Sequence, residues 1–175
     1  TGTGAFSGGH TTHPAVPPRT VDANVKPALA ALYKRGAPPF FVPLMPDPSI
    51  PPSAREHVKL QRTYMTDSKM RSAEFAQALT AMLKAFAKQY PEAKVRTFDT
   101  FTYSQQRMAQ AAAKGYNVTE PCYTPKFMGL PGAVCADPKQ YLSWDTNHPT
   151  EAGSTGMGLA FARAVVDTAA TSMDT

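Results

Sequence analysis

"ALYKRGAPPFFVPLMPDPSIPP", residues 31–52, decides the fold because it joins the end of a helix to a short strand. Apolar residues at helical spacing enter this stretch and stop at Gly36, which predicts that a helix ends there. That stripe consists of Val25, Leu29, Leu32 and Tyr33. The run PFFVPLMP, residues 39–46, is apolar and short, as buried strands are, although Pro43 moves it toward a sheet edge or a strand end. A helix followed closely by a strand predicts an α/β arrangement.

The start of this helix is limited by a proline within its stripe. Pro27 is tolerated only in a first helical turn, so the helix should begin near Asp22 or Asn24. Residues 1–20 have no periodicity and are rich in Gly, Thr and Pro, which predicts a loop.

Downstream of residue 46 the same reasoning predicts further helices and one more strand. In order, we expect a helix over residues 75–90 after a polar stretch, a strand over 94–102, a helix over 102–115, a long loop over 116–150 and a final helix over 150–170. The alternation of helices and strands over 21–115 is typical of an α/β fold with a parallel sheet. Two strands are too few for such a sheet, which normally has about five and is covered on both faces. We therefore expect residues 1–175 to be the C-terminal part of one domain whose first strands belong to a segment outside this chain.

The composition fits one globular domain with a core: 175 residues, of which 42% are hydrophobic. The net charge of +5 comes from scattered lysines and arginines without a run of like charge, which argues against a nucleic-acid partner. No apolar stretch approaches the roughly 20 residues of a transmembrane helix. These features exclude a transmembrane segment within the chain and leave an enzyme or a binding protein.

Cys122 and Cys135 are the only two cysteines, and the segment between them is rich in Pro and Gly and can turn back easily. We interpret them as a disulfide that pins the 116–150 loop and contributes roughly 3 kcal/mol of stability. Two free buried thiols or half of a metal site are the alternatives, but no second Cys/His pair lies at zinc spacing. Asn117 begins an Asn-Val-Thr acceptor sequence for glycosylation. Together the disulfide and the sequon predict a secreted protein whose targeting segment is removed or lies outside the chain.

The segment YLSWDTNHPTEAG, residues 141–153, places Asp145 three residues before His148. In a hydrolytic triad a neutral imidazole takes the proton of an attacking hydroxyl, and a carboxylate on its other nitrogen holds the ring in the correct tautomer. Three residues of loop are enough for this contact. The spacing is also compatible with an aspartate that caps a turn and a surface histidine near the start of a helix.

The context of this pair resembles a known family. "CADPKQYLSWDTNHPTEAG", residues 135–153, resembles the C-terminal signature of the GDSL, or SGNH, lipases and esterases. Residues 31–52 and "KVRTFDTFTYSQQ", 94–106, are similar to the same family's helix, turn and strands. The resemblance implies the C-terminal half of a three-layer α/β/α fold and a serine triad without metal or cofactor. By this similarity Asp145 and His148 are the orienting acid and the base. Trp144 is a packing residue or a wall of the substrate pocket.

The chain departs from the family where the nucleophile should be, because it has no G-D-S-L and no G-x-N-D sequence. "TDSK", residues 66–69, is the nearest imitation, but no buried strand precedes it, so Ser68 is not expected to be the nucleophile. The serine and the oxyanion hole are expected on a separate N-terminal chain or segment of the same protein, as in a proteolytically nicked enzyme. His10 and His13 have a spacing that could hold a metal on a helix, but neighbouring glycines and a proline indicate a loop or a pocket rim.

The resulting hypothesis is a secreted serine ester hydrolase of the lipase, phospholipase or acetylesterase type, or an acyltransferase, acting on a lipid or an acylated carbohydrate. The alternative is a catalytically silent secreted binding or effector protein on the same scaffold. A third interpretation is a regulatory hydrolase that is activated by a cut before Thr1.

Overall fold

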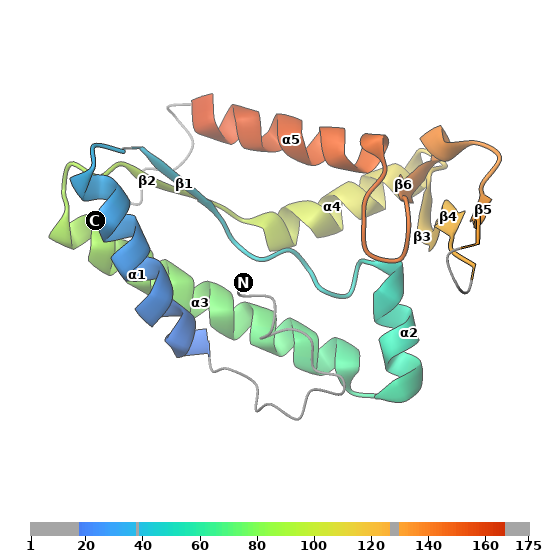
Figure 1. Ribbon diagram of the computed structural model, residues 1–175, viewed down its shortest axis with the longest axis horizontal. Helices are drawn as coiled ribbons and strands as arrows, with labels where there is room; N and C mark the ends of the chain where they lie inside the picture. The colour runs from blue at the N-terminus through green and yellow to red at the C-terminus, as the bar shows by residue number, and fades with distance from the viewer. Residues whose placement is uncertain (1–17, 38, 127–129, 167–175) are drawn as a thin grey trace.

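The computed structural model describes residues 18–37, 39–126 and 130–166 (Figure 1). Its elements are α1 (Pro18–Lys34), β1 (Phe40–Pro43), α2 (Pro52–Leu60), α3 (Tyr64–Gln89), β2 (Val95–Phe98), α4 (Thr100–Ala113), β3 (Asn117–Pro121), β4 (Tyr123–Thr124), β5 (Ala133–Val134), the short 3₁₀ helix η3 (Pro138–Gln140), β6 (Tyr141–Ser143) and α5 (Glu151–Val166).

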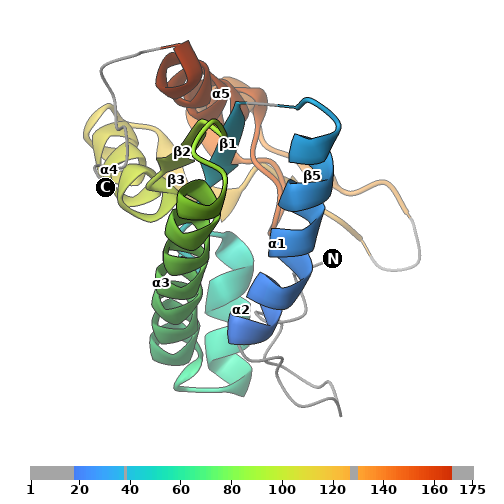
Figure 2. The same cartoon turned by 90° about the vertical axis from the view of Figure 1, so that its left-hand side faces the viewer.

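A parallel pair of strands, β1 and β2, lies between two layers of helices (Figures 1 and 2). Helices α1 and α3 lie on one face, and α4 and α5 lie on the other. The pair begins with Phe40 opposite Val95 and ends with Pro43 opposite Phe98. A second parallel pair, β3 and β6, and a small antiparallel pair, β4 and β5, lie at the far end of the molecule. The predicted α/β order with parallel pairing is therefore present.

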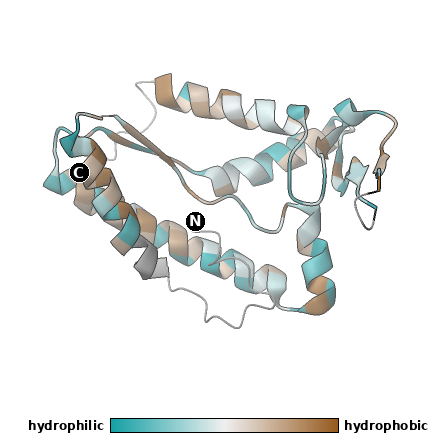
Figure 3. Cartoon of the chain, in the orientation of Figure 1, coloured by the Kyte–Doolittle hydropathy of each residue, from teal (hydrophilic) through white to brown (hydrophobic). Residues whose placement is uncertain are grey.

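The main hydrophobic core fills the space between α1, α3 and the first strand pair. Leu83 and Phe86 of α3 are completely buried, and the ring of Phe86 meets that of Phe40 edge-on at 5.8 Å. Hydrophobic residues gather along β1 and β2 and on the neighbouring parts of α1 and α3 (Figure 3). The buried cluster consists of Leu29, Phe40, Leu79, Met82, Leu83, Phe86, Ala93 and Val95.

An aromatic group packs α5 against the opposite face of the strands. Phe161 of α5 lies 5.4 Å from Phe41 and 5.1 Å from Phe98, measured between ring centroids. Because successive strand residues point to opposite faces, Phe40 reaches α3 while Phe41 reaches α5. Helices thus cover both faces of the two-stranded pair. Two strands were expected to be too few for a sheet covered in this way. Large apolar side chains nevertheless remain exposed on the helices, namely Leu32, Leu60, Met70, Leu159, Val165 and Val166.

Helix α1 begins earlier than predicted and contains Pro27 in its interior. Pro18 occupies the first helical position, where a missing N–H costs nothing. Downstream, Leu29 is buried and Val25 and Tyr33 pack on the core, and this contact offsets the hydrogen bond that Pro27 lacks. Leu32, the fourth member of the predicted stripe, is about half exposed at 49%. The predicted end of the helix is correct, and Gly36 has the left-handed φ of +82° that suits a glycine there.

The polar stretch before residue 75 is helical, which the apolar periodicity did not predict. Helix α2 lies there, and α3 begins at Tyr64. The inward face of early α3 carries the small polar residues Ser68 and Ser72, which are buried although they are not apolar. A helix that buries serines leaves no hydrophobic stripe in its sequence.

The predicted loop over residues 116–150 contains strands β3 to β6, so that prediction is wrong in part. These strands are two to five residues long, too short for an alternating pattern to be seen. The disulfide between Cys122 and Cys135 is present, with a Cα–Cα distance of 4.7 Å. In the part of the chain that the structure describes, no helix has the length and apolarity to cross a membrane.

Candidate active site

A tight loop between β6 and α5 carries Asp145 and His148. The N–H of Trp144 donates to the carbonyl of His148 at 2.8 Å, and Ser143 and Pro149 form an isolated bridge. Thr150 fixes the end of this loop to β6. Its N–H donates to Leu142 O at 2.9 Å, and its hydroxyl donates to Tyr141 O at 2.6 Å. The loop is therefore held at both ends by the backbone of one strand.

Asp145 and His148 are in direct contact. The Nδ1 atom of His148 lies 2.8 Å from Oδ2 and 3.0 Å from Oδ1 of the carboxylate. The backbone N–H groups of Asn147 and His148 donate to the same carboxylate at 2.8 and 2.7 Å. Asp145 thus caps the turn, as the simpler interpretation has it, and also holds the imidazole, as the triad interpretation requires.

The charge state of Asp145 follows from these contacts. Partial burial alone would raise the pKa of this carboxyl group, but the N–H of Asn147 and the ring and N–H of His148 lower the pKa below its ordinary value of 3.8. The group is therefore an anion at neutral pH. An anion at Nδ1 keeps the proton of a neutral imidazole on that atom and leaves Nε2 with a lone pair.

The other side of the ring is open. The side chain of His148 is 75% exposed, and within residues 18–37, 39–126 and 130–166 no group hydrogen-bonds to Nε2. A cavity of about 200 Å³ lies beside it, between the 44–51 loop, α4 and α5. Its walls are mostly apolar; Ile50, Pro52, Met108, Leu142 and Met157 are among them. Ser104 and Ser143 also line it, but neither hydroxyl forms a hydrogen bond to His148.

A buried aspartate that the sequence reasoning missed fixes the opposite wall of this cavity. Asp47 is 3% exposed and accepts hydrogen bonds from the N–H and hydroxyl of Ser49 at 2.9 and 2.7 Å. It also accepts from Gln105 of α4 at 2.8 Å, and Lys69 of α3 lies 3.6 Å away. One carboxylate therefore connects the loop, α3 and α4. In the sequence, Asp47 is marked only as an acidic residue between two prolines, in a segment whose composition is typical of a loop.

The wall that Asp47 holds is joined to the histidine loop through the start of α2. The N–H of Ser53 donates to the carbonyl of Thr146 at 2.9 Å. Thr146 lies between Asp145 and His148, so a displacement of the 44–51 loop would reach the candidate base.

Asp47→Asn should destabilise the natural protein by about 2 kcal/mol at neutral pH. The substitution removes the buried negative charge and replaces one acceptor oxygen by an NH₂ group, which cannot accept a hydrogen bond. Burial raises the pKa of Asp47, but Ser49, Gln105 and Lys69 hold it below 3.8. A depressed pKa in the folded state means that the stabilisation is present above pH 3.8 and is lost as the pH falls through the folded value. Urea unfolding from pH 7 to pH 3 should show the difference from wild type shrinking toward the acid end.

Glu92→Gln is the matched control, because Glu92 is exposed and forms no ion pair among the described residues. A destabilisation by Asp47→Asn that does not change with pH would contradict the assignment of this carboxylate as an ionised anchor.

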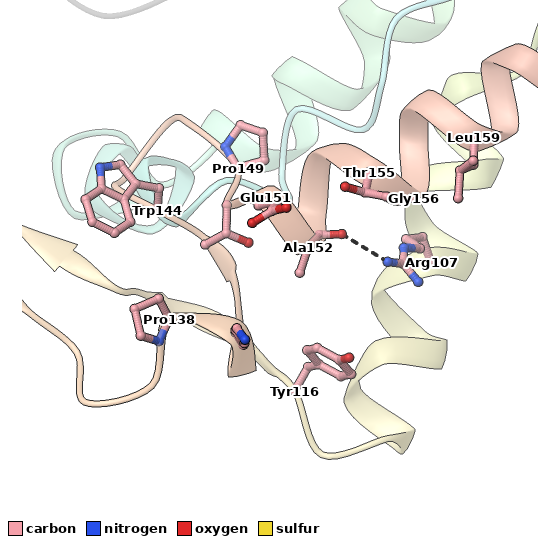
Figure 4. Close-up of a pocket in the computed structure, with 12 residues that line it drawn as sticks. Arg107, Tyr116, Pro138, Trp144, Pro149, Glu151, Ala152, Thr155, Gly156 and Leu159 are labelled. Carbon is pink, nitrogen blue, oxygen red and sulfur yellow. Dashed lines mark hydrogen bonds between the residues drawn. The ribbon is translucent and has the colours of Figure 1, made fainter.

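Among the described residues, the others that the sequence analysis singled out form no hydrogen bond to the ring of His148. Trp144 is 37% exposed, stacks on Tyr123 at 5.6 Å and lines a second, larger cavity (Figure 4). Ser68 is buried inside α3 and donates to Tyr64 O at 2.5 Å, so it lies apart from the cavity at His148. Asn117 begins β3, and its side-chain oxygen accepts from the N–H groups of Thr119 and Glu120. His10 and His13 fall outside the described residues.

No group of His, Cys, Asp and Glu in the described part of the chain is arranged to hold a metal ion. The chain thus combines an α/β fold with a histidine that a carboxylate holds in the loop before α5, a combination typical of α/β hydrolytic enzymes. The sequence profile of the GDSL-like Lipase/Acylhydrolase family matches residues 10–161. The chain belongs to this family and has its SGNH-type α/β fold. A comparison with curated protein sequences finds no match.

Proposed function

We propose that the chain supplies the acid and the base of a Ser-His-Asp triad that cleaves a carboxylic ester. The observation that carries the proposal is the 2.8 Å contact between Asp145 and Nδ1 of His148, with Nε2 left for a hydroxyl. In this arrangement Nε2 takes the proton of the serine as the serine attacks the ester carbonyl. The proton then passes to the leaving alcohol, and water later hydrolyses the acyl-enzyme by the same route.

The nucleophile in this proposal belongs to an N-terminal segment of the same protein, on a separate chain or an uncut one. The exposed ring of His148 and the apolar cavity beside it leave room for a serine and an acyl group. The exposed apolar residues of α1, α3 and α5 support a segment that packs on these helices.

The free edge of β1 supports the same arrangement. Phe40 and Leu44 donate their N–H groups to Lys94 and Phe98 on the β2 side. Since backbone groups alternate in direction along a strand, those of Phe41 point away from β2. Within the described residues β1 is paired only with β2, so a further parallel strand would extend the sheet at this edge.

Secretion is part of the proposal. A disulfide persists in oxidising compartments, and Cys122 and Cys135 form one. The amide nitrogen of Asn117 forms no hydrogen bond among the described residues, while its oxygen holds the turn. That geometry is compatible with a glycan on the nitrogen. The ester itself, in a lipid or an acylated carbohydrate, is left to the substrate test.

Labelling of the natural protein with a fluorophosphonate probe tests the proposal. Intact mass before and after reduction would first show whether a second polypeptide copurifies with this chain. We expect the label on a serine N-terminal to this chain, on the second polypeptide or on the uncut precursor. Absence of label on any chain would contradict the proposal and favour a silent binding protein on the same scaffold. Label on Ser104 or Ser143 would place the nucleophile within the chain.

A further inference from the structure

A cavity of about 750 Å³ lies between α4, the β3–β6 pair and the first half of α5 (Figure 4). Trp144 and Pro149 form one wall, and Arg107 and Leu159 lie across from them. Tyr116 and Thr155 contribute hydroxyl groups to the lining. The volume is that of a site for a small molecule rather than for single waters.

Arg107 of α4 enters this cavity with most of its hydrogen-bonding capacity unused. Its Nη2 donates to the carbonyl of Ala152 at 3.2 Å (Figure 4), and its buried Nε has no partner within the described residues. The guanidinium lies flat against α5 at Gly156, where an added Cβ would come within 2.6 Å of Nε. A glycine at this helix position therefore makes room for the cation, and a buried Nε donor without an acceptor is costly.

Lys139 supplies a second positive charge to the same lining. Neither Arg107 nor Lys139 belongs to an ion pair in the described part of the chain, whereas Arg55, Lys59 and Lys69 each have an acidic partner. Glu151 is the single acidic residue of the lining, and no ion pair joins it to either cation among the described residues. The cavity therefore carries a net positive charge that the described protein does not neutralise.

We propose that this cavity binds a small anionic ligand whose carboxylate or phosphate group is held by Arg107 and Lys139. Arginine donors in a fixed plane suit the oxygens of either group. Trp144 and Leu159 offer apolar surface to the remainder of the ligand, and Tyr116 and Thr155 offer hydroxyls to its polar groups. Arg107 and Pro149 also line the cavity beside His148, but the inference needs no serine and no ester hydrolysis, so its test is separate from that of the proposed function.

The test uses the natural protein, with any chain that copurifies with it, and follows tryptophan fluorescence. Trp144 is the only tryptophan of this chain and lies in the cavity wall, so it reports on occupancy. Titrations with inorganic phosphate and with D-glucuronate distinguish the two anionic groups, and neutral D-glucose is the uncharged reference. We expect saturable quenching or enhancement by at least one anion, weakened by added salt and absent in Trp144→Phe.

Variants identify the residues. Lys139→Met should raise Kd about threefold to tenfold, because one charge-assisted contact to an exposed side chain is lost. Gly156→Ala should raise Kd about tenfold, since its methyl group pushes the guanidinium of Arg107 aside while no charge is removed. The alanine also favours the helix by about 1 kcal/mol, which offsets the lost hydrogen bond from Arg107 to Ala152, so the variant should fold with near wild-type stability. Lys84→Met, which removes an exposed charge on α3, is the matched control and should leave Kd unchanged.

Three results would overturn the proposal. Equal responses to glucose and to the anions would show a site without charge selectivity. No response to either anion, or an unchanged Kd in both Lys139→Met and Gly156→Ala, would mean that Arg107 only ties α4 to α5 or that the protein itself neutralises the cations.

Discussion

Replacing His148 with alanine should lower kcat/KM for ester hydrolysis by about 10⁵-fold, since loss of a triad base abolishes activation of the serine. The structure makes this expectation specific, because Asp145 holds one ring nitrogen and leaves the other for a hydroxyl. The assay uses the natural protein with a chromogenic acetyl or butyryl ester. Fluorophosphonate labelling should slow in parallel, because the same proton transfer activates the serine toward the probe.

His57→Ala is the matched control for this variant. His57 lies on α2, where Nδ1 is 2.7 Å from Ser53 O and the ring stacks on Tyr64 at 4.6 Å. These contacts leave it a structural role, so its removal should change thermal stability more than kcat. If His148→Ala hydrolysed esters as fast as wild type, the triad assignment would be wrong whatever the fold.

Asp145→Asn should lower kcat by about 10⁴-fold with a small change in KM. An amide at this position can donate its N–H₂ to Nδ1, which moves the imidazole proton to Nε2 and leaves no base for the serine. The amide oxygen can still accept from the N–H groups of Asn147 and His148, so the turn should persist. Steady-state kinetics with circular dichroism on the same samples would separate loss of chemistry from loss of fold.

Asp137→Asn is the control for this second variant. Asp137 has the same kind of local role, because its carboxylate accepts from the N–H of Lys139 at the start of η3. It has no histidine partner among the described residues, so kcat should remain within about twofold of wild type, as for surface substitutions away from a site. Equal losses in the two variants would indicate that turn capping, and not the orientation of His148, explains the effect.

The sequence predicted best the elements whose own residues determine them. Strand β2 and helix α4 lie close to their expected places because Asp99 caps the helix, accepting from Thr102 N–H at 3.0 Å, and Gly115 ends it with φ of +83°. The contact between Asp145 and His148 was also predicted, as one of two interpretations of their spacing, and the structure shows both the turn cap and the contact with the ring. Local rules of this kind need no knowledge of the tertiary structure.

The failures concern features that depend on contacts far apart in the chain. Strands β3 and β6 are ordered mainly by pairing with each other, and nothing in either segment alone identifies a strand. Asp47 becomes an anchor only because α3 and α4 bring Lys69 and Gln105 to it. The predicted place of Pro27 in a first turn rests on helix propensity, which the packing of α1 on α3 overrides.

The disulfide of Cys122 and Cys135 is connected to the candidate active site by backbone hydrogen bonds. Cys122 and Tyr123 donate their N–H groups to Ser143 and Trp144, the residues that lead directly into Asp145. The large core between α1 and α3 contains no disulfide and is stabilised by the burial of hydrophobic side chains. Order at the candidate base, His148, is thus coupled to the disulfide, while order in the core between α1 and α3 is not. A reducing compartment would therefore loosen the end of the molecule that carries Asp145 and His148, while the core between α1 and α3 persists.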